Sequence, residues 1–258
     1  METITKTTSQ ESEIQAAEIN NQRVFKAGSL ASWVLLAYSL ATMVIVIALG
    51  TAPETARATF DMLRSDRLVG LLRLDILTVF CMPLYLVLFF SVYLALKKSS
   101  GAQAALLTLL VMAGLTLFLA TPSVFSWISL SDRFAAATDP VQKNLLLAAG
   151  EAILASDMWH GSGPIIGGLL QQIGATLISV TMLRSKVFSK WTGWVGVVTH
   201  GFDLLHILGG FFTPVLSIAG MAVAGPLYLV WFPLVAIDLV KLGQGKSPSP
   251  FYPSKGAS

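Results

Sequence analysis

The chain has very little charge. Only 12% of its 258 residues are Asp, Glu, Lys or Arg, whereas 54% are apolar and the mean hydropathy is +0.71. A soluble domain of this size carries about 25% charged residues. The shortage therefore excludes a soluble enzyme, a disordered chain and a nucleic-acid-binding protein, and it indicates an integral membrane protein.

Cysteine and familiar catalytic motifs are also scarce. The single cysteine, Cys81, lies in an apolar run, so we expect a small buried side chain without a disulfide or a thiolate metal cluster. The sequence has no G-x-S-x-G, P-loop or paired-carboxylate motif, no pore signature and no arginine-rich voltage helix. These absences favour a protein that is not an enzyme, and we predict no cofactor.

Long hydrophobic runs are abundant. A membrane-spanning helix needs about 20 mostly apolar residues, and six runs qualify: 29–50, 68–96, 104–130, 164–183, 191–212 and 220–242. The predicted fold is therefore all-α, a polytopic bundle of six transmembrane helices. It lies between a polar segment at 1–28, frayed or partly helical, and a tail at 243–258 whose Gly, Pro and Ser content predicts disorder.

The lengths of the runs raise two further expectations. The second and third runs exceed the bilayer thickness and must tilt, kink or protrude, with Pro83 and Pro122 as natural breaks. The last two runs are separated only by a turn at Phe211–Pro214, which predicts a tight helical hairpin. Five spans with a re-entrant segment remain the alternative.

Lys and Arg are divided unevenly between the two ends of these runs. Eleven lie before the first run, at the end of the last run or after it, or in the connections that follow the second and fourth, and six lie on the other side. Cytoplasmic loops are enriched in Lys and Arg. We therefore predict a multi-pass protein of the cell membrane with both termini in the cytoplasm.

The outward connection at 131–163 is expected to contain its own helix. Asp139 is placed as the N-cap, Pro140 suits the first helical position and Gln142 fits a capping box. On a helical wheel the polar side carries Lys143, Asn144 and Glu151. The opposite side is apolar, which predicts an extracytoplasmic amphipathic helix between spans 3 and 4 that lies on the outer leaflet or caps the bundle.

The fifth run has the densest group of ionisable residues, each costing about 2.5–3.5 kcal/mol inside hydrocarbon on insertion scales. One face of its wheel carries Gly193, Gly196, His200, Asp203, Ile207 and Gly210, with His206 at the edge. The opposite face carries Trp194, Val198, Phe202 and Leu205. We expect the small and polar face to turn toward neighbouring helices and the apolar face toward lipid.

Two interpretations of this polar face stay open. In the structural one, the glycines permit close helix approach and the polar side chains form hydrogen bonds between helices. In the functional one, His200, Asp203 and His206, with His160 before the fourth run, relay protons or bind a metal ion. His200 and His206 are about 9 Å apart along a helix axis, so a metal would need ligands from other spans. We favour the structural interpretation and predict no metal site.

Other polar residues lie at or in the runs. Asp75 either pairs with a histidine of the fifth run or caps polar groups near the outer interface. Gln171 and Gln172 are expected to form hydrogen bonds between helices. Asp238 and Lys241 are spaced as a solvated surface pair.

Four segments carry a family resemblance. They are Ser129–Thr138 (SLSDRFAAAT), Leu147–Ala152 (LAAGEA), Met182–Ser185 with Phe188–Gly196 (FSKWTGWVG), and Pro226–Leu234 (PLYLVWFPL). Over about residues 25–243 the chain resembles a prokaryotic membrane family catalogued as domain of unknown function 4386, although a Glu is expected at or near Asp238. The resemblance implies a six-helix membrane protein and no established activity, catalytic residue or cofactor.

Three classes of function follow. We favour a non-enzymatic protein that binds or transports a small solute or lipid through the bundle interior. One alternative is an intramembrane metal- or haem-dependent enzyme that uses His200, Asp203, His206 and His160. The other is a structural or regulatory membrane subunit. The predicted partners are the lipid bilayer and the solute or lipid, without nucleic acid, and the oligomeric state is not indicated.

Overall fold

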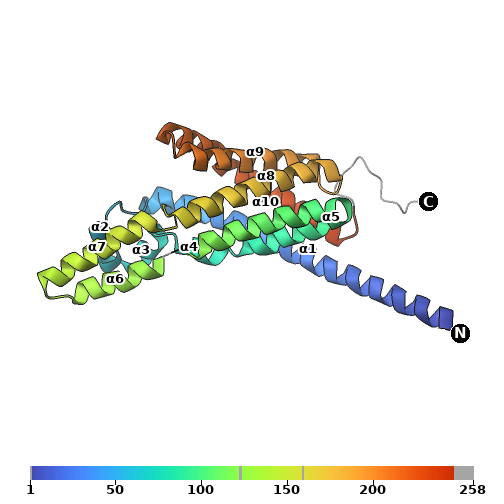
Figure 1. The fold of residues 1–258 in the computed structure, drawn as a ribbon, viewed down its shortest axis with the longest axis horizontal. Coiled ribbons are helices and arrows are strands. Elements are labelled where there is room, and N and C mark those ends of the chain that lie inside the picture. The colour runs from blue at the N-terminus through green and yellow to red at the C-terminus, as the bar shows by residue number, and fades with distance from the viewer. Residues whose placement is uncertain (1, 122–123, 159, 247–258) are drawn as a thin grey trace.

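The computed structural model describes residues 2–121, 124–158 and 160–246, with side chains from residue 19 onward. Within these residues the chain is helical and contains no strand (Figure 1). The helices are α1 (Glu2–Leu49), α2 (Ala56–Ser65), α3 (Arg67–Arg73), α4 (Ile76–Cys81), α5 (Leu84–Leu119), α6 (Val124–Ala136), α7 (Pro140–Ser156), α8 (Ser162–Ser185), α9 (Lys190–Gly209) and α10 (Pro214–Gly243).

Several helical stretches are long and apolar enough to cross a membrane. Among the described residues there are four: Ile19–Leu49, Ile76–Ala136, Ser162–Ser185 and Pro214–Gly243. The prediction of an all-helical membrane protein is therefore confirmed.

The second of these stretches folds back on itself. Ser100, inside α5, has φ −148° and ψ 42°, outside the helical region. Figure 1 shows the parts of α5 before and after this residue as two arms that lie side by side. At 1.5 Å per residue the second arm is about 28 Å long, close to the thickness of a bilayer core.

α1, both arms of α5, α8, α9 and α10 form one bundle. Contacts run from α1 to α5, α8, α9, α10 and back to α1, so the helices close into a ring. Side chains join α1 to both neighbours: Ser91 Oγ donates to the Val24 carbonyl at 3.0 Å, and Ser32 Oγ donates to the Phe232 carbonyl at 2.8 Å. The shared apolar core includes Leu35, Leu88, Phe89, Val111, Ile178, Trp231 and Leu239.

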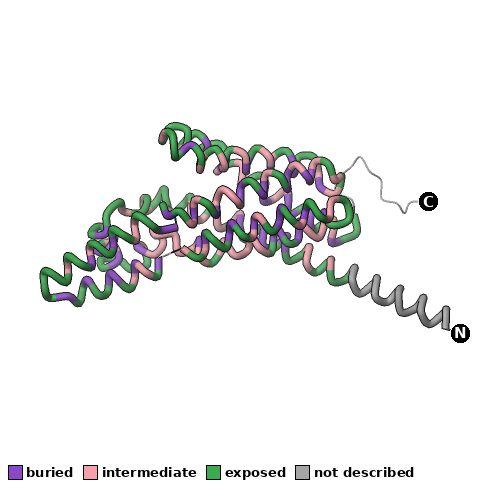
Figure 2. The backbone as a smooth tube through the Cα atoms, in the orientation of Figure 1, coloured by how far each residue is buried: buried purple, intermediate pink, exposed green. Residues whose placement is uncertain are grey.

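α2, α3, α6 and α7 form a separate helical cap at the end of the bundle opposite the N-terminus (Figure 1). Figure 2 shows buried residues in the cap as well as in the bundle. The cap has its own apolar core, which consists of Ala56, Phe60, Leu63, Trp127, Leu130, Phe134, Ala137 and Leu146. An ion pair between Arg67 and Asp132 joins α3 to α6.

The cap changes the boundaries expected for the second and third runs. Residues from Leu68 onward lie in α3, and the chain then breaks at Asp75, whose φ of 58° is left-handed. The α5 helix ends at Leu119 and α6 starts anew at Val124. Leu71 and Leu74 of the second run therefore pack against the core of the cap, and Trp127 and Leu130 of the third run are part of it. Pro83 stands at the break between α4 and α5, as predicted, whereas Pro122 lies outside the described residues.

α7 begins at the predicted residue, and its faces differ in part from the wheel. Asp139 Oδ1 accepts a hydrogen bond from the Val141 amide at 3.1 Å. Leu146 and Gly150 are buried against the cap, whereas Leu145 is 66% exposed. Glu151, expected on the solvated side, accepts a hydrogen bond from the Ala56 amide at 2.8 Å and so caps α2.

The two ends of the chain differ from expectation in one respect. The segment at 1–28 is part of a continuous helix that begins at Glu2 and extends beyond the bundle (Figure 1). The described part of the predicted tail comprises the end of α10 at Gly243 and three further residues. Residues 247–258, where disorder is predicted, lie outside the described residues.

α9 and α10 form the tight hairpin that the sequence predicts. Thr213 Oγ1 accepts a hydrogen bond from the Val215 amide at 3.0 Å and caps the start of α10. The two helices approach closely at Gly220, where a Cβ atom would lie 2.6 Å from the His206 amide nitrogen. Only glycine fits at this crossing.

Candidate functional site

The half of the bundle nearest the cap encloses a large cavity, which we call the chamber. Its volume is about 1140 Å³, and α1, α4, α5, α8, α9 and α10 all contribute to its walls. Most of the wall is apolar. The polar residues on it are Tyr38, Ser39, Thr42, Thr78, Tyr85, His160, Gln171, Gln172, Asp203, His206, Ser217 and Tyr228. Of the described residues that line the chamber, Asp203 is the only acidic one, and none is Lys or Arg.

The polar face of α9 turns inward as predicted. His200 is 1% exposed, and Asp203 and His206 both line the chamber. Trp194, on the opposite face, is 57% exposed. Gly196 makes this approach feasible, because a Cβ atom there would lie 2.5 Å from Ser179 Oγ and 2.6 Å from Trp231 Nε1.

Asp203 is the centre of a network between three helices. Its Oδ2 atom accepts hydrogen bonds from Gln172 Nε2 of α8 and from the Tyr228 hydroxyl of α10, each at 2.7 Å. Gln172 Nε2 also donates to the Tyr228 hydroxyl at 3.2 Å. Gln172 therefore does form the interhelical hydrogen bonds predicted for it, and the network fixes one carboxylate oxygen of Asp203.

His200 occupies the buried side of the same network. Its Nδ1 atom is 2.9 Å from Gln172 Oε1. Gln172 Nε2 donates to a carboxylate, so the other amide atom of Gln172, Oε1, is the one that faces His200. Because Oε1 can only accept a hydrogen bond, the imidazole of His200 must carry its proton on Nδ1. Its Nε2 is buried without a hydrogen-bond partner among the described residues, and the ring packs edge-on against Trp231 at 4.6 Å between centroids.

His206 is held apart from this network by α10. Its Nδ1 atom lies 2.9 Å from both the carbonyl oxygen and the hydroxyl oxygen of Ser217. The carbonyl can only accept, so Nδ1 of His206 carries a proton as well. His206 thus lines the chamber one turn beyond Asp203 with its own partner.

Asp75 lies near the chamber with Thr78 and Tyr38. The Thr78 hydroxyl donates to the Asp75 carboxylate and is 2.5 Å from the Tyr38 hydroxyl. Thr78 and Tyr38 line the chamber, while Asp75 lies behind them. Of the two roles considered for Asp75, the structure places it with local polar groups, and its hydrogen-bond partners among the described residues include no histidine.

His160 stands at the chamber edge nearest the cap, with its side chain 62% exposed and its Nδ1 atom 2.9 Å from Asp157 Oδ1. His160, His200 and His206 therefore have three different partners. Among the residues that the structure describes, no three His, Cys, Asp or Glu side chains are close enough to hold a metal ion.

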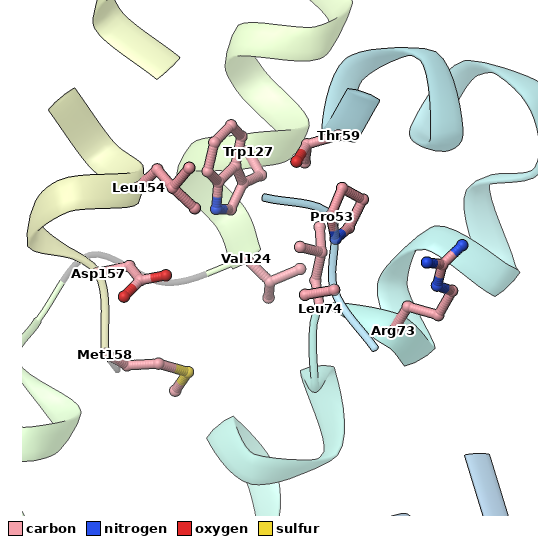
Figure 3. A pocket seen from close by; sticks show the side chains of 10 residues that line it. Pro53, Thr59, Arg73, Leu74, Val124, Trp127, Leu154, Asp157 and Met158 are labelled. Atoms are coloured by element: carbon pink, nitrogen blue, oxygen red, sulfur yellow. The ribbon is translucent and has the colours of Figure 1, made fainter. Parts of the chain in front are cut away.

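A second, smaller cavity lies where the cap meets the bundle (Figure 3). Its volume is about 40 Å³, and Trp127, Leu154, Arg73 and Asp157 are among its lining residues. A cavity of this size holds one or two water molecules. The chamber is therefore the candidate site for an organic ligand.

The interpretation of Asp238 as a solvated surface residue is wrong. Asp238 is 3% exposed, and its Oδ2 atom accepts hydrogen bonds from the Ser189 amide at 2.9 Å and the Thr192 hydroxyl at 2.5 Å. These donors are the unpaired groups at the start of α9. The i, i+3 spacing of Asp238 and Lys241 could not predict this contact, because the contact joins two different helices, α10 and α9. Cys81 also differs from expectation, since it is only half-buried.

Comparison with known proteins adds no relative: no family model, curated protein or solved structure matches this chain. The resemblance to the family of unknown function therefore stays a prediction based on the quoted segments.

Sequence reasoning missed the residues that complete the site from other helices. Tyr228 is not among the predicted site residues, yet its hydroxyl donates a hydrogen bond to Asp203. Tyr38 and Thr78 were not linked to each other or to the chamber. One signal was available: Tyr228 lies in the middle of an apolar helix, where a hydroxyl needs a partner.

Proposed function

We propose that this protein binds a small solute or lipid in the chamber and moves it across or within the membrane. The proposal rests on the size and the lining of the chamber. Binding sites for small molecules measure about 300–1,000 Å³ and combine apolar walls with a few placed polar groups. The chamber, at about 1140 Å³, is slightly larger than this range, and it combines apolar walls with the Asp203 network.

The proposal includes six spans in the cell membrane, with both termini in the cytoplasm. The spans are α1, the two arms of α5, α8, α9 and α10. α9 has 20 residues, about 30 Å, which is long enough to cross although its His and Asp residues lower its hydropathy. The excess of Lys and Arg at the end of the bundle that holds the termini supports this orientation.

In this arrangement the cap, including α7, lies outside the cytoplasm, and α7 packs on α2 and α6 of the cap. The chamber then opens toward the outer half of the membrane. The resemblance to the family of unknown function agrees with six helices and supplies no activity.

A metal- or haem-dependent enzyme has less support. It needs His200, Asp203, His206 and His160 to converge, and these side chains bind Gln172, Tyr228, Ser217 and Asp157 instead. No observation favours a purely structural subunit.

Filling the chamber tests the proposal. Gly225 lines it, and a Cβ atom at this position would meet nothing within 4 Å. Gly225→Leu should therefore project into the chamber without disturbing the bundle. A side chain before proline is tolerated in this helix, since Phe232 precedes Pro233.

The measurement is binding of radiolabelled octanol, a neutral amphiphile, to protein in lipid nanodiscs, with empty nanodiscs subtracted. We expect Gly225→Leu to weaken binding about tenfold or more, which corresponds to about 1.4 kcal/mol. Gly201→Leu is the matched control, because Gly201 also has open space but does not line the chamber. Equal loss in both variants, or none in Gly225→Leu, contradicts the proposal.

A further inference from the structure

The chamber has a marked charge preference. Asp203 is the only acidic residue among its described lining residues, and no Lys or Arg faces it. The two ion pairs among the described residues, Arg67–Asp132 and His160–Asp157, do not involve Asp203. Its carboxylate therefore has hydrogen-bond donors and, among these described residues, no Lys or Arg beside it, and the ionisable side chain next to it on α9 is His206, whose Nδ1 atom binds Ser217.

We infer that the chamber binds an amphiphile with an ammonium headgroup, whose positive charge lies at Asp203 and whose apolar tail fills the remaining space. The inference rests on the proposed function and names its ligand class. A cationic headgroup supplies the opposite charge that a carboxylate in a low-dielectric site requires. An anionic headgroup, such as a phosphate or a carboxylate, would be repelled by the Asp203 carboxylate.

The polar contacts of Asp203 leave one oxygen for such a headgroup. Gln172 and Tyr228 both donate to Oδ2, and among the described residues no hydrogen bond is found to Oδ1. Two donors on one oxygen also hold the carboxylate in a fixed orientation. The ligand therefore meets a preorganised acceptor that does not have to be ordered on binding.

Aromatic rings flank the same position. Tyr85 and Tyr228 both line the chamber and both pack against Phe232, with ring centroids 5.9 Å and 5.5 Å away from it. They therefore belong to the same part of the wall as Asp203, the hydrogen-bond partner of Tyr228. The face of a tyrosine ring attracts ammonium groups, quaternary ones included. Aromatic rings and a carboxylate together favour an organic cation over a metal ion.

The rest of the wall suits an apolar tail. Ile47 of α1 and Phe211 beyond α9 line the chamber and are also 77% and 61% exposed. They connect the chamber to the lipid-facing surface. Figure 1 shows the tip of the α9–α10 hairpin diverging from the rest of the bundle on this side. A tail can thus extend between α1 and the hairpin toward lipid.

Charge-matched probes test the inference. Octyltrimethylammonium, octanol and octyl sulfate carry the same chain and differ in the charge of the head. We measure the binding of each to the full-length protein in nanodiscs of neutral lipid, with empty nanodiscs subtracted. The expected order of affinity is octyltrimethylammonium, octanol, octyl sulfate.

Asp203→Asn gives the second arm of the test. It should weaken octyltrimethylammonium binding roughly 30-fold or more, as expected when one partner of a buried charge pair is lost. Octanol binding should fall much less than octyltrimethylammonium binding, so the ratio of the two affinities measures the effect of the charge, and a single symmetric gel-filtration peak shows that the variant is folded. Asp203→Glu should retain the preference for the cation.

The outcomes separate the two proposals. One outcome is that octanol binds the wild-type protein, that Gly225→Leu abolishes this binding, and that the wild-type protein shows no preference for the cation. In that case the chamber proposal stands and the ligand class is wrong. If no probe binds the wild-type protein, both fail. If Asp203→Asn loses octanol binding as well, the variant does not report on charge. The wild-type protein then tests the inference: tighter binding of octyltrimethylammonium than of octanol supports it, and equal binding overturns it.

Discussion

At the scale of single residues, removal of the Tyr228 hydroxyl is the clearest test of the network around Asp203. The hydroxyl donates to Asp203 at 2.7 Å and accepts from Gln172 at 3.2 Å, so Tyr228→Phe removes a partner from both. We expect a loss of about 1 kcal/mol in the free energy of unfolding, typical of a hydrogen bond between membrane helices. Thermal unfolding in detergent measures it. Tyr93→Phe, which removes a hydroxyl on α5 outside the network, should change stability less, and equal effects would contradict a role for Tyr228.

The same residues show what can be predicted at this scale. The inward direction of His200 and Asp203 followed from the sequence, because a 3.6-residue period assigns each side chain to a face of its own helix. Tyr228 and Gln172 could not be assigned to Asp203, because the partner on another helix depends on the register of the crossing. That register is set by contacts such as Gly196 with Trp231, whose identity no single helix reveals.

At the scale of helices, α9 is anchored by a carboxylate from α10. Asp238→Ala removes the acceptor of the Ser189 amide and of the buried Thr192 hydroxyl, which keeps only Ser189 Oγ, 2.7 Å away, as a partner. We expect a loss of about 2 kcal/mol in stability, since unpaired buried donors cost about 1–3 kcal/mol each. Lys241→Ala, at the position once expected to pair with Asp238, should change stability by less than about 0.5 kcal/mol. Chemical unfolding in mixed micelles distinguishes the two, and similar losses would restore the surface-pair interpretation.

Helix positions could be predicted better than helix ends. Hydrophobic runs located α1, α8 and the α9–α10 hairpin, since apolar length is a property of the local sequence. The same signal could not separate the bilayer from the core of the cap, because Leu71 in α3 and Trp127 in α6, which pack in the cap, are as apolar as lipid-facing residues. The left-handed break at Asp75 was equally hidden, because a non-glycine residue gives no local signal for a positive φ.

At the scale of the whole molecule, the arrangement in the membrane can be tested with single cysteines. Cys81 is the only cysteine in the sequence, so Cys81→Ser provides a background without thiols. Val141→Cys then places a thiol on α7 of the cap, at a position 65% exposed, and Gly101→Cys places one at the turn of α5. The second arm of α5, about 28 Å long, lies between these two ends of the bundle. A membrane-impermeant maleimide should therefore reach only one of them from outside an intact cell.

The distribution of Lys and Arg decides which one. The α5 turn follows Lys97 and Lys98 and lies at the end of the bundle with more basic residues, so Gly101→Cys should react only after the membrane is opened. Val141→Cys should react in intact cells. Gln244→Cys, just beyond α10, should behave like Gly101→Cys, because an even number of crossings returns the chain to its starting side. If it behaves like Val141→Cys instead, α9 and α10 do not both cross, and the chamber between them does not face the membrane as proposed.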